Sequence, residues 1–247
     1  MRFVLATTLI SLALAAPAAP GSSSPHPRQL GPFGKGADTY WLWRAQGKPR
    51  AVVVFMHGLD RRELKPKNHL AWIEHLVEQG DDVVYPMYEV QPGVRGALLH
   101  TLTAVGAALK RLGRPKAPLV VVGYSRGGRL AVEFAAIAPA IKAAPAAVMS
   151  VFPSQLNPAA EEVIDLRTLE RTTRIMLVVG QEDGRQGASE LLTRLRSAGF
   201  PAKNVQPLLV RSRGKFHADH FSALQSGPEI RRQLWAPLDR LIRSVER

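Results

Sequence analysis

The stretch LVVVGYSRGG, residues 119–128, decides the fold of this chain. A short apolar run is followed at once by the pattern Gly-x-Ser-x-Gly, from Gly123 to Gly127, and then by a helical pattern that ends near Ala138. Strand, sharp turn and helix in this order form the context of a nucleophile elbow, with Ser125 at its strained apex. Gly123 and Gly127 lack a Cβ atom, so strand and helix can approach closely beside the turn. The alternative is a chance match in a glycine-rich loop.

Apolar runs and amphipathic segments alternate along the rest of the chain. Buried parallel strands read as continuous apolar runs, and helices as apolar residues three or four apart. We therefore expect an antiparallel edge strand at 38–45, further strands at 51–56, 82–86, 119–122, 146–152, 174–179 and 205–210, and helices at 68–79, 96–112, 129–138, 188–197 and 228–245. This alternation predicts an α/β fold with a mostly parallel sheet and helices on both faces.

These features resemble the α/β-hydrolase superfamily, in the small single-domain form of bacterial esterases and dienelactone-hydrolase-like proteins. The resemblance covers nearly the whole chain after its N-terminal segment, and it implies the order nucleophile, acid, histidine for the catalytic residues. Larger lipases carry a long helical lid where this chain has only the short segment 154–171, so we expect a minimal cap or none. Dienelactone hydrolases use a cysteine at the elbow, whereas this chain has a serine there and no cysteine.

The resemblance implies a catalytic triad of Ser125, Asp183 and His220. A serine hydroxyl is a poor nucleophile near neutral pH, so it needs a base that a third group holds in the right tautomer. Asp183 fits the family pattern of a small turn, Asp, then Gly, and its neighbour Glu182 is the competing acid. His220 stands in Asp-His-Phe, a form often found at the catalytic histidine of relatives, and His217 is the competing base.

The resemblance also implies where the oxyanion hole lies. The pair His57 and Gly58 ends the strand at 51–56, and in the family the following loop supplies one backbone N–H, which here belongs to Leu59. The second donor is the N–H of Arg126, directly after the nucleophile. His57 is expected to belong to the scaffold of this loop and to take no part in proton transfer.

Charged side chains near the expected site bear on the substrate. If Arg61, Arg62 and Arg126 line the mouth of the site, they favour a carboxylate-bearing substrate; the alternative is that they extend into solvent. The formal net charge is +13, with 33 Lys and Arg against 20 Asp and Glu, but the basic residues are scattered and no nucleic-acid-binding motif is present. We therefore expect a small-molecule ester-type substrate, which in the first case is anionic, and no nucleic acid partner.

Composition is typical of a globular protein. With 247 residues, 46% hydrophobic and 21% charged, the chain can bury the core of a single α/β domain, and it contains no internal repeat. The absence of cysteine excludes a thiol nucleophile, a disulfide framework and a cysteine-based metal site. The pattern predicts no cofactor and no metal.

The N-terminus has the features of an export signal. Arg2 precedes an apolar stretch to Ala16, followed by a small-residue cleavage pattern, and the stretch is short of the roughly 20 residues that span a bilayer. We expect residues 1–19 to be an export signal, 20–37 a flexible leader rich in Pro, Gly and Ser, and 38–247 the domain. The protein would then be periplasmic or secreted and have no stable membrane span; the alternative is a retained signal anchor.

The sequence favours a serine hydrolase that cleaves a carboxylic ester through an acyl-enzyme, with thioesters or amides as variants of the same acyl transfer. Two alternatives come from other classes. One is a protein of the same fold whose cleft binds without turnover, and the other is a cationic protein that binds anionic lipid or cell-wall polymer. A change in salt concentration distinguishes the cationic binding protein from the hydrolase. Higher ionic strength screens surface charges and weakens binding to an anionic polymer, but it barely affects hydrolysis of a neutral ester.

Overall fold

The computed structural model describes residues 28–91, 93, 95–184 and 186–246. At its centre lies one eight-stranded sheet with the order β1-β2-β4-β3-β5-β6-β7-β8. β1 and β2, and β2 and β4, pair antiparallel, whereas every other neighbouring pair is parallel. The strands are β1 Gln29–Phe33, β2 Tyr40–Trp43, β3 Val52–Met56, β4 Asp82–Pro86, β5 Leu119–Tyr124, β6 Ala147–Val151, β7 Arg174–Gly180 and β8 Val205–Val210.

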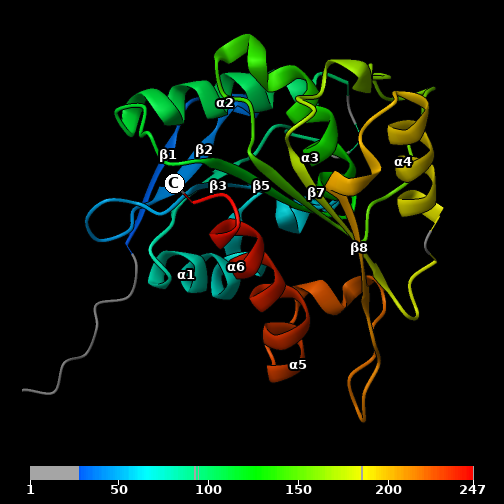
Figure 1. Cartoon of the computed structure of the whole chain (residues 1–247). Helices are drawn as coiled ribbons and strands as arrows, with labels where there is room; N and C mark the ends of the chain where they lie inside the picture. Colours follow the sequence, from blue (N-terminus) through cyan, green and yellow to red (C-terminus); the bar gives the residue numbers. More distant parts are fainter. Residues whose placement is uncertain (1–27, 92, 94, 185, 247) are drawn as a thin grey trace, which may run out of the picture.

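Helices cover both faces of this sheet, with α2, α3 and α4 on one side and α1, α5 and α6 on the other (Figure 1). The α-helices are α1 Leu70–Glu78, α2 Ala97–Arg111, α3 Arg126–Ile137, α4 Gln186–Ser197, α5 Pro228–Ile230 and α6 Ala236–Arg243. A π-helical turn, Arg231–Trp235, joins α5 to α6 where the sequence predicts one continuous helix. The predicted fold class is confirmed.

The apolar runs in the sequence arise because each central strand is buried on both faces. In β3, Val52, Val54 and Met56 belong to the core beneath α2, α3 and α4. The alternate residues Val53 and Phe55 belong to the second core, which packs against α1 and α6. Burying each apolar side chain of this kind contributes roughly 1.5–3 kcal/mol to the stability of the folded protein. The two cores on one sheet therefore stabilise the scaffold that carries the loops.

The N-terminal edge of the sheet differs from the prediction. Tyr40–Trp43 is antiparallel as expected, but it is not an edge strand, because β1 pairs with its outer side. β1 lies within residues 20–37, the expected flexible leader, so residues 29–33 belong to the domain. Leu30 and Phe33 pack against the core, and the Arg111 guanidinium lies 3.9 Å from the centre of the Phe33 ring. The export signal and residues 20–27 lie outside the described part of the chain.

The connection between β6 and β7 is short, as expected. It contains one 3-10 helix, Leu166–Thr168, and within its described residues no α-helix that could form a lid. The loops that follow β3, β5, β7 and β8 leave from the carboxyl ends of parallel strands, and these ends meet at one edge of the sheet, where open α/β sheets bind their ligands. Among the described residues, no helix combines the length and hydropathy that crossing a membrane requires.

Candidate active site

The turn after β5 has the geometry of a nucleophile elbow. Ser125 has φ 55° and ψ −121°, a strained conformation for a residue with a side chain. A Cβ on Gly123 would lie 2.0 Å from the Gly127 carbonyl oxygen, and one on Gly127 would lie 2.2 Å from the His57 carbonyl oxygen. Only glycine therefore fits at these two positions, and the predicted reason for the motif is confirmed. α3 begins directly after the serine, at Arg126.

Side chains from three loops form one hydrogen-bonded chain at the elbow. Nε2 of His220 lies 2.9 Å from Ser125 Oγ, and Nδ1 of the same ring lies 3.0 Å from Asp183 Oδ1. Asp183 follows β7, and His220 begins the 3-10 helix His220–Leu224. The exposed fraction of the side chain falls from 34% for His220 to 13% for Asp183. The structure thus brings together the nucleophile, base and acid that the resemblance implied.

The two competing residues pair with each other instead. Nδ1 of His217 lies 3.1 Å from Glu182 Oε2, and both side chains are largely exposed. Glu182 also accepts a hydrogen bond from the Ser212 hydroxyl. These bonds lower the pKa of Glu182, first through Ser212 and then through His217. The pair therefore closes the base of the loop at 211–217, next to the triad and separate from it.

Aromatic rings surround His220. The ring centres of Tyr124, Phe221 and Phe152 lie 5.3, 5.7 and 6.4 Å from that of the imidazole. Burial raises the pKa of the Tyr124 hydroxyl above its ordinary value. Phe221 itself is 66% exposed and so offers an apolar surface beside the base. The Asp-His-Phe pattern marks Phe221 in the sequence, whereas no motif marks the other two rings.

The loop after β3 is held from inside by His57. Its two ring nitrogens each lie 2.7 Å from a carbonyl oxygen, that of Gly58 and that of Met87. Burial lowers the pKa of His57 from 6.5 to about 4, so the ring is neutral and donates to one of the two oxygens at a time. The expected structural role of His57 fits this setting.

The same loop presents the candidate oxyanion donor. The Gly58 carbonyl and the Leu59 N–H share one planar peptide unit, so a bond from His57 to that carbonyl orients the N–H. The Gly58 N–H donates to the buried Glu63 carboxylate over 2.6 Å. In the described part of the chain, the Leu59 N–H has no hydrogen-bond partner.

The side chain of Arg126 is not where either expectation placed it. It is 4% exposed, and it forms ion pairs with Glu89, in the loop after β4, and with Glu161, in the connection between β6 and β7. Arg62 is exposed and pairs with Asp60 over 2.6 Å. Arg126 therefore faces neither the mouth of the site nor solvent.

Glu89 and Glu161 are functional candidates that sequence reasoning missed. Burial raises the pKa of Glu89, and the charge of Arg126 only partly offsets that effect. Burial also acts to raise the pKa of Glu161, but a hydrogen bond from Arg126 and the charge of Arg129 outweigh it and lower this pKa. No spacing signal pairs either acid with Arg126, because they lie 37 and 35 residues away along the chain.

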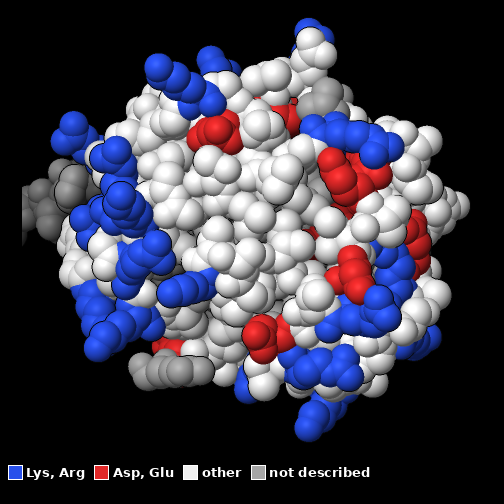
Figure 2. Space-filling view, turned by 90° about the horizontal axis from the view of Figure 1, so that it is seen from above, with Lys and Arg blue, Asp and Glu red and all other residues white. Residues whose placement is uncertain are grey.

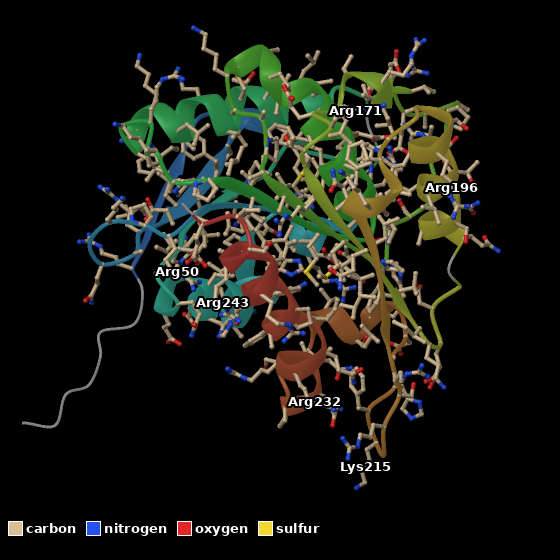
Figure 3. The ribbon with its side chains drawn as sticks, viewed as in Figure 1. Arg50, Arg171, Arg196, Lys215, Arg232 and Arg243 are labelled. Atoms are coloured by element: carbon tan, nitrogen blue, oxygen red, sulfur yellow. The ribbon has the colours of Figure 1, made fainter. Side chains whose placement is uncertain are left out.

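Basic side chains lie around the margin of the face shown in Figure 2. They are grouped on its left side, and acidic side chains lie beside those on its right side. The basic residues labelled in Figure 3 are distributed over several parts of the molecule, and Lys215 is at the tip of the loop that extends from β8. Within the residues described, no group of three His, Asp or Glu side chains is arranged to hold a metal ion.

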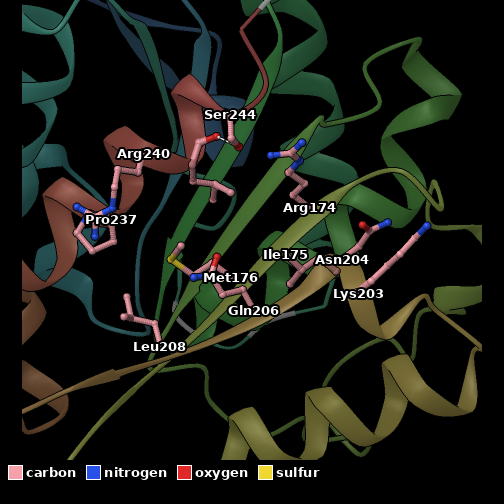
Figure 4. A pocket seen from close by; sticks show the side chains of 11 residues that line it. Arg174, Ile175, Met176, Lys203, Asn204, Gln206, Leu208, Pro237, Arg240 and Ser244 are labelled. Atoms are coloured by element: carbon pink, nitrogen blue, oxygen red, sulfur yellow. Dashed lines mark hydrogen bonds between the residues drawn. The ribbon is translucent and has the colours of Figure 1, made fainter.

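A cavity of about 490 Å³ lies between α6 and the strands β7 and β8 (Figure 4). Arg174, Lys203 and Arg240 contribute cations to its lining, and Met176 and Leu208 contribute apolar surface. None of the triad residues lines it. This cavity is therefore separate from the hydrogen-bonded chain of Ser125, His220 and Asp183.

Comparisons with known proteins rest on structure. No protein-family model and no curated protein matches the sequence. Esterase B from Lactobacillus rhamnosis has a TM-score of 0.63 at 17% identity, covering 89% of this chain and 86% of that one. Carboxyl esterase 2 from Tuber melanosporum has a TM-score of 0.62 at 15% identity, and the match covers 84% of this chain and 83% of that one. A Klebsiella pneumoniae protein assigned as a dienelactone hydrolase has a TM-score of 0.60 at 13% identity, and the match covers 83% of this chain and 92% of that one. The chain thus has the α/β-hydrolase fold.

Proposed function

We propose that this protein hydrolyses carboxylic esters by acyl transfer to Ser125. The observation that carries the proposal is the chain of contacts Ser125–His220–Asp183, which is set at a strained elbow between a strand and a helix. A hydrogen-bonded base and an acid that orients it are what a serine needs to become a nucleophile. The esterases with a similar fold add a second line of support.

In the proposed reaction, Ser125 Oγ attacks the ester carbonyl carbon while His220 Nε2 takes the hydroxyl proton. The carbon–oxygen bond to the alcohol breaks, His220 returns that proton to the leaving alkoxide, and an acyl-serine remains. Water then attacks the acyl-serine with His220 again as base, which releases the carboxylic acid and restores the hydroxyl. Asp183 holds His220 in the tautomer that presents an unprotonated Nε2 to the serine. Thioesters and amides are variants of the same transfer.

The oxyanion is proposed to bind the backbone N–H groups of Leu59 and Arg126. Leu59 supplies its N–H from the loop after β3, and Arg126 stands at the first turn of α3. Leu59→Pro removes one donor, and loss of such a donor costs about 10²–10³-fold in kcat. We expect that loss with little change in KM. A folded Leu59→Pro protein with unchanged kcat would place the donor elsewhere.

The site supports a neutral substrate better than an anionic one. Arg126, the arginine next to the nucleophile, is buried between two glutamates. Arg62 is paired with Asp60, which leaves Arg61 as the one arginine of the three that is exposed and has no ion pair within the described residues. Leu59 and Phe221 are both more than half exposed beside the triad and offer apolar contacts instead. We therefore propose a neutral, partly apolar ester, and a competition assay between neutral and succinyl esters tests this preference.

Hydrolysis of 4-nitrophenyl acetate and butyrate tests the proposed function. We expect saturable turnover by the wild-type protein and none above background by Ser125→Ala. Binding of an ester without turnover by well-folded wild-type protein would instead support a cleft used for binding alone.

We also propose that the protein acts outside the cytoplasm, which its N-terminal sequence supports. Mass spectrometry of the protein from its native host should find an N-terminus between residues 16 and 21. Intact Met1 on the purified soluble protein would contradict export.

A further inference from the structure

Six charged side chains form one chain of ion pairs behind the elbow, which we call the α3 charge cluster: Glu89, Arg126, Glu161, Arg129, Glu133 and Arg194. Each member contacts the next in that order, so that positive and negative groups alternate. Five of the side chains are at most 9% exposed, and Arg194 is 17% exposed. The cluster holds three cations and three anions, so it is neutral as a whole.

Glu161 is the link between the two arginines of α3. Its Oε1 accepts from Arg126 Nε over 2.6 Å and also from Arg129 Nη2. Its Oε2 accepts from the Asn157 N–H over 3.1 Å, so the carboxylate also closes the turn that carries it. Both oxygens are thus engaged, and one carboxylate joins the first turn of α3 to the connection between β6 and β7.

That connection contacts the elbow at a second point. The Ser154 N–H donates to the Ser125 carbonyl oxygen over 3.1 Å. The segment from 154 to 161 therefore holds the nucleophile through its backbone and the next residue, Arg126, through its side chain. Two attachments on adjacent residues fix both the position and the rotation of the first turn of α3.

We propose that Glu161 is a positioning residue for the reaction at Ser125: by holding the Arg126 side chain, it sets the Ser125 hydroxyl and the Arg126 N–H against the substrate carbonyl. The inference rests on the proposed function and adds to it a residue that does not touch the substrate. Removing one partner from a buried ion pair leaves an uncompensated charge, which drives the remaining groups to rearrange. Here the group that rearranges is the side chain of Arg126, the residue directly after Ser125. A misplacement of about 1 Å at an active site can lower the rate by roughly 10²-fold.

The other end of the cluster supplies a matched control. Glu133 lies within the same helix and bridges Arg129 and Arg194, and its side chain is fully buried. Glu133→Gln removes the same charge from the same cluster as Glu161→Gln, but the ion pairs of Glu133 are with Arg129 and Arg194 and not with Arg126, the residue after Ser125. Both variants should lower the free energy of unfolding. Only Glu161→Gln should disturb the chemistry.

The experiment measures kcat, KM and urea unfolding for both variants with 4-nitrophenyl acetate, at a temperature where each is folded. We expect Glu161→Gln to lose 10- to 100-fold in kcat with KM within about threefold, and Glu133→Gln to keep kcat within about threefold. Glu161→Asp keeps the charge and should recover part of the lost kcat; it also stands in if Glu161→Gln does not fold. The neighbour Glu162, which accepts from the Gly96 N–H, supplies a surface control as Glu162→Gln.

Three outcomes overturn the proposal. Equal kcat in Glu161→Gln and Glu133→Gln would reduce Glu161 to a structural residue while leaving the proposed function intact. The same conclusion follows if Glu161→Asp is the variant that folds and its kcat equals that of the wild type. Absence of Ser125-dependent turnover in the wild-type protein would overturn the proposed function, and this inference with it.

Discussion

Two acid–histidine pairs lie side by side in this molecule, and only one of them contacts the serine of the elbow. Glu182 pairs with His217, and Asp183 pairs with His220, at distances of 3.1 and 3.0 Å. The acids are neighbours at the end of β7, and the histidines lie three residues apart in one loop. Only His220 has a second ring nitrogen within 2.9 Å of Ser125 Oγ. Residue type and pairing are therefore insufficient to distinguish the two histidines; the contact with the serine distinguishes them.

Replacing the two histidines in turn should give the largest difference. His220→Ala removes the base, and by comparison with serine hydrolases of the same design kcat should fall by about 10⁵–10⁶-fold. His217→Ala removes only an exposed pair, so its kcat should stay within about threefold of the wild type. Ester turnover measures both. If His217→Ala were the inactive variant, the roles assigned to the two pairs would be reversed.

The two acids should differ by less. Asp183→Asn keeps the shape of the side chain but favours the wrong tautomer of His220, which costs about 10⁴-fold in the best-studied triads. Glu182→Gln should leave kcat within about threefold, because its partners are His217 and Ser212. Stopped-flow turnover of 4-nitrophenyl acetate has the range to measure both. Similar losses in the two variants would mean that the acids act as one unit.

A third histidine sharpens the comparison because it is buried. The pKa of His57 is lowered by burial from 6.5 to about 4, so between these values the unfolded chain binds a proton that the folded protein does not. The free energy of unfolding should therefore fall by about 3 kcal/mol as the pH drops from 6.5 to 4. Urea unfolding across this range should show His57→Gln losing less stability on acidification than the wild type. A constant offset between His57→Gln and wild type would contradict the account.

Most of the fold was predictable because its signals are local. Buried strands such as Val52–Met56 are continuous apolar runs, and Gly123 and Gly127 mark a turn whose crowding only glycine accommodates. β1 was missed because Gly31 and Pro32 make its sequence resemble a loop, and its pairing with β2 is a tertiary contact. The continuous helix expected at 228–245 is interrupted by a π-helical turn that the apolar spacing does not mark.

The candidate site was predictable as far as motif and order carry information. Ser125, Asp183 and His220 follow from the elbow, the strand-end turn and the Asp-His-Phe pattern. The buried partners of Arg126 could not be predicted from the sequence, because an ion pair between Arg126 and Glu161 depends on how two distant loops pack. The arginine was expected at the surface, where this residue type usually lies, and the structure places it inside because two glutamates neutralise it.

Reaction with a fluorophosphonate followed by peptide mass spectrometry tests the central claim most directly, since only an activated serine attacks the phosphorus. The account predicts one phosphonyl group per chain, attached to Ser125, with labelling abolished in Ser125→Ala and His220→Ala and retained in His217→Ala. Folded wild-type protein that takes up no label, or takes it up at another residue, would contradict the account.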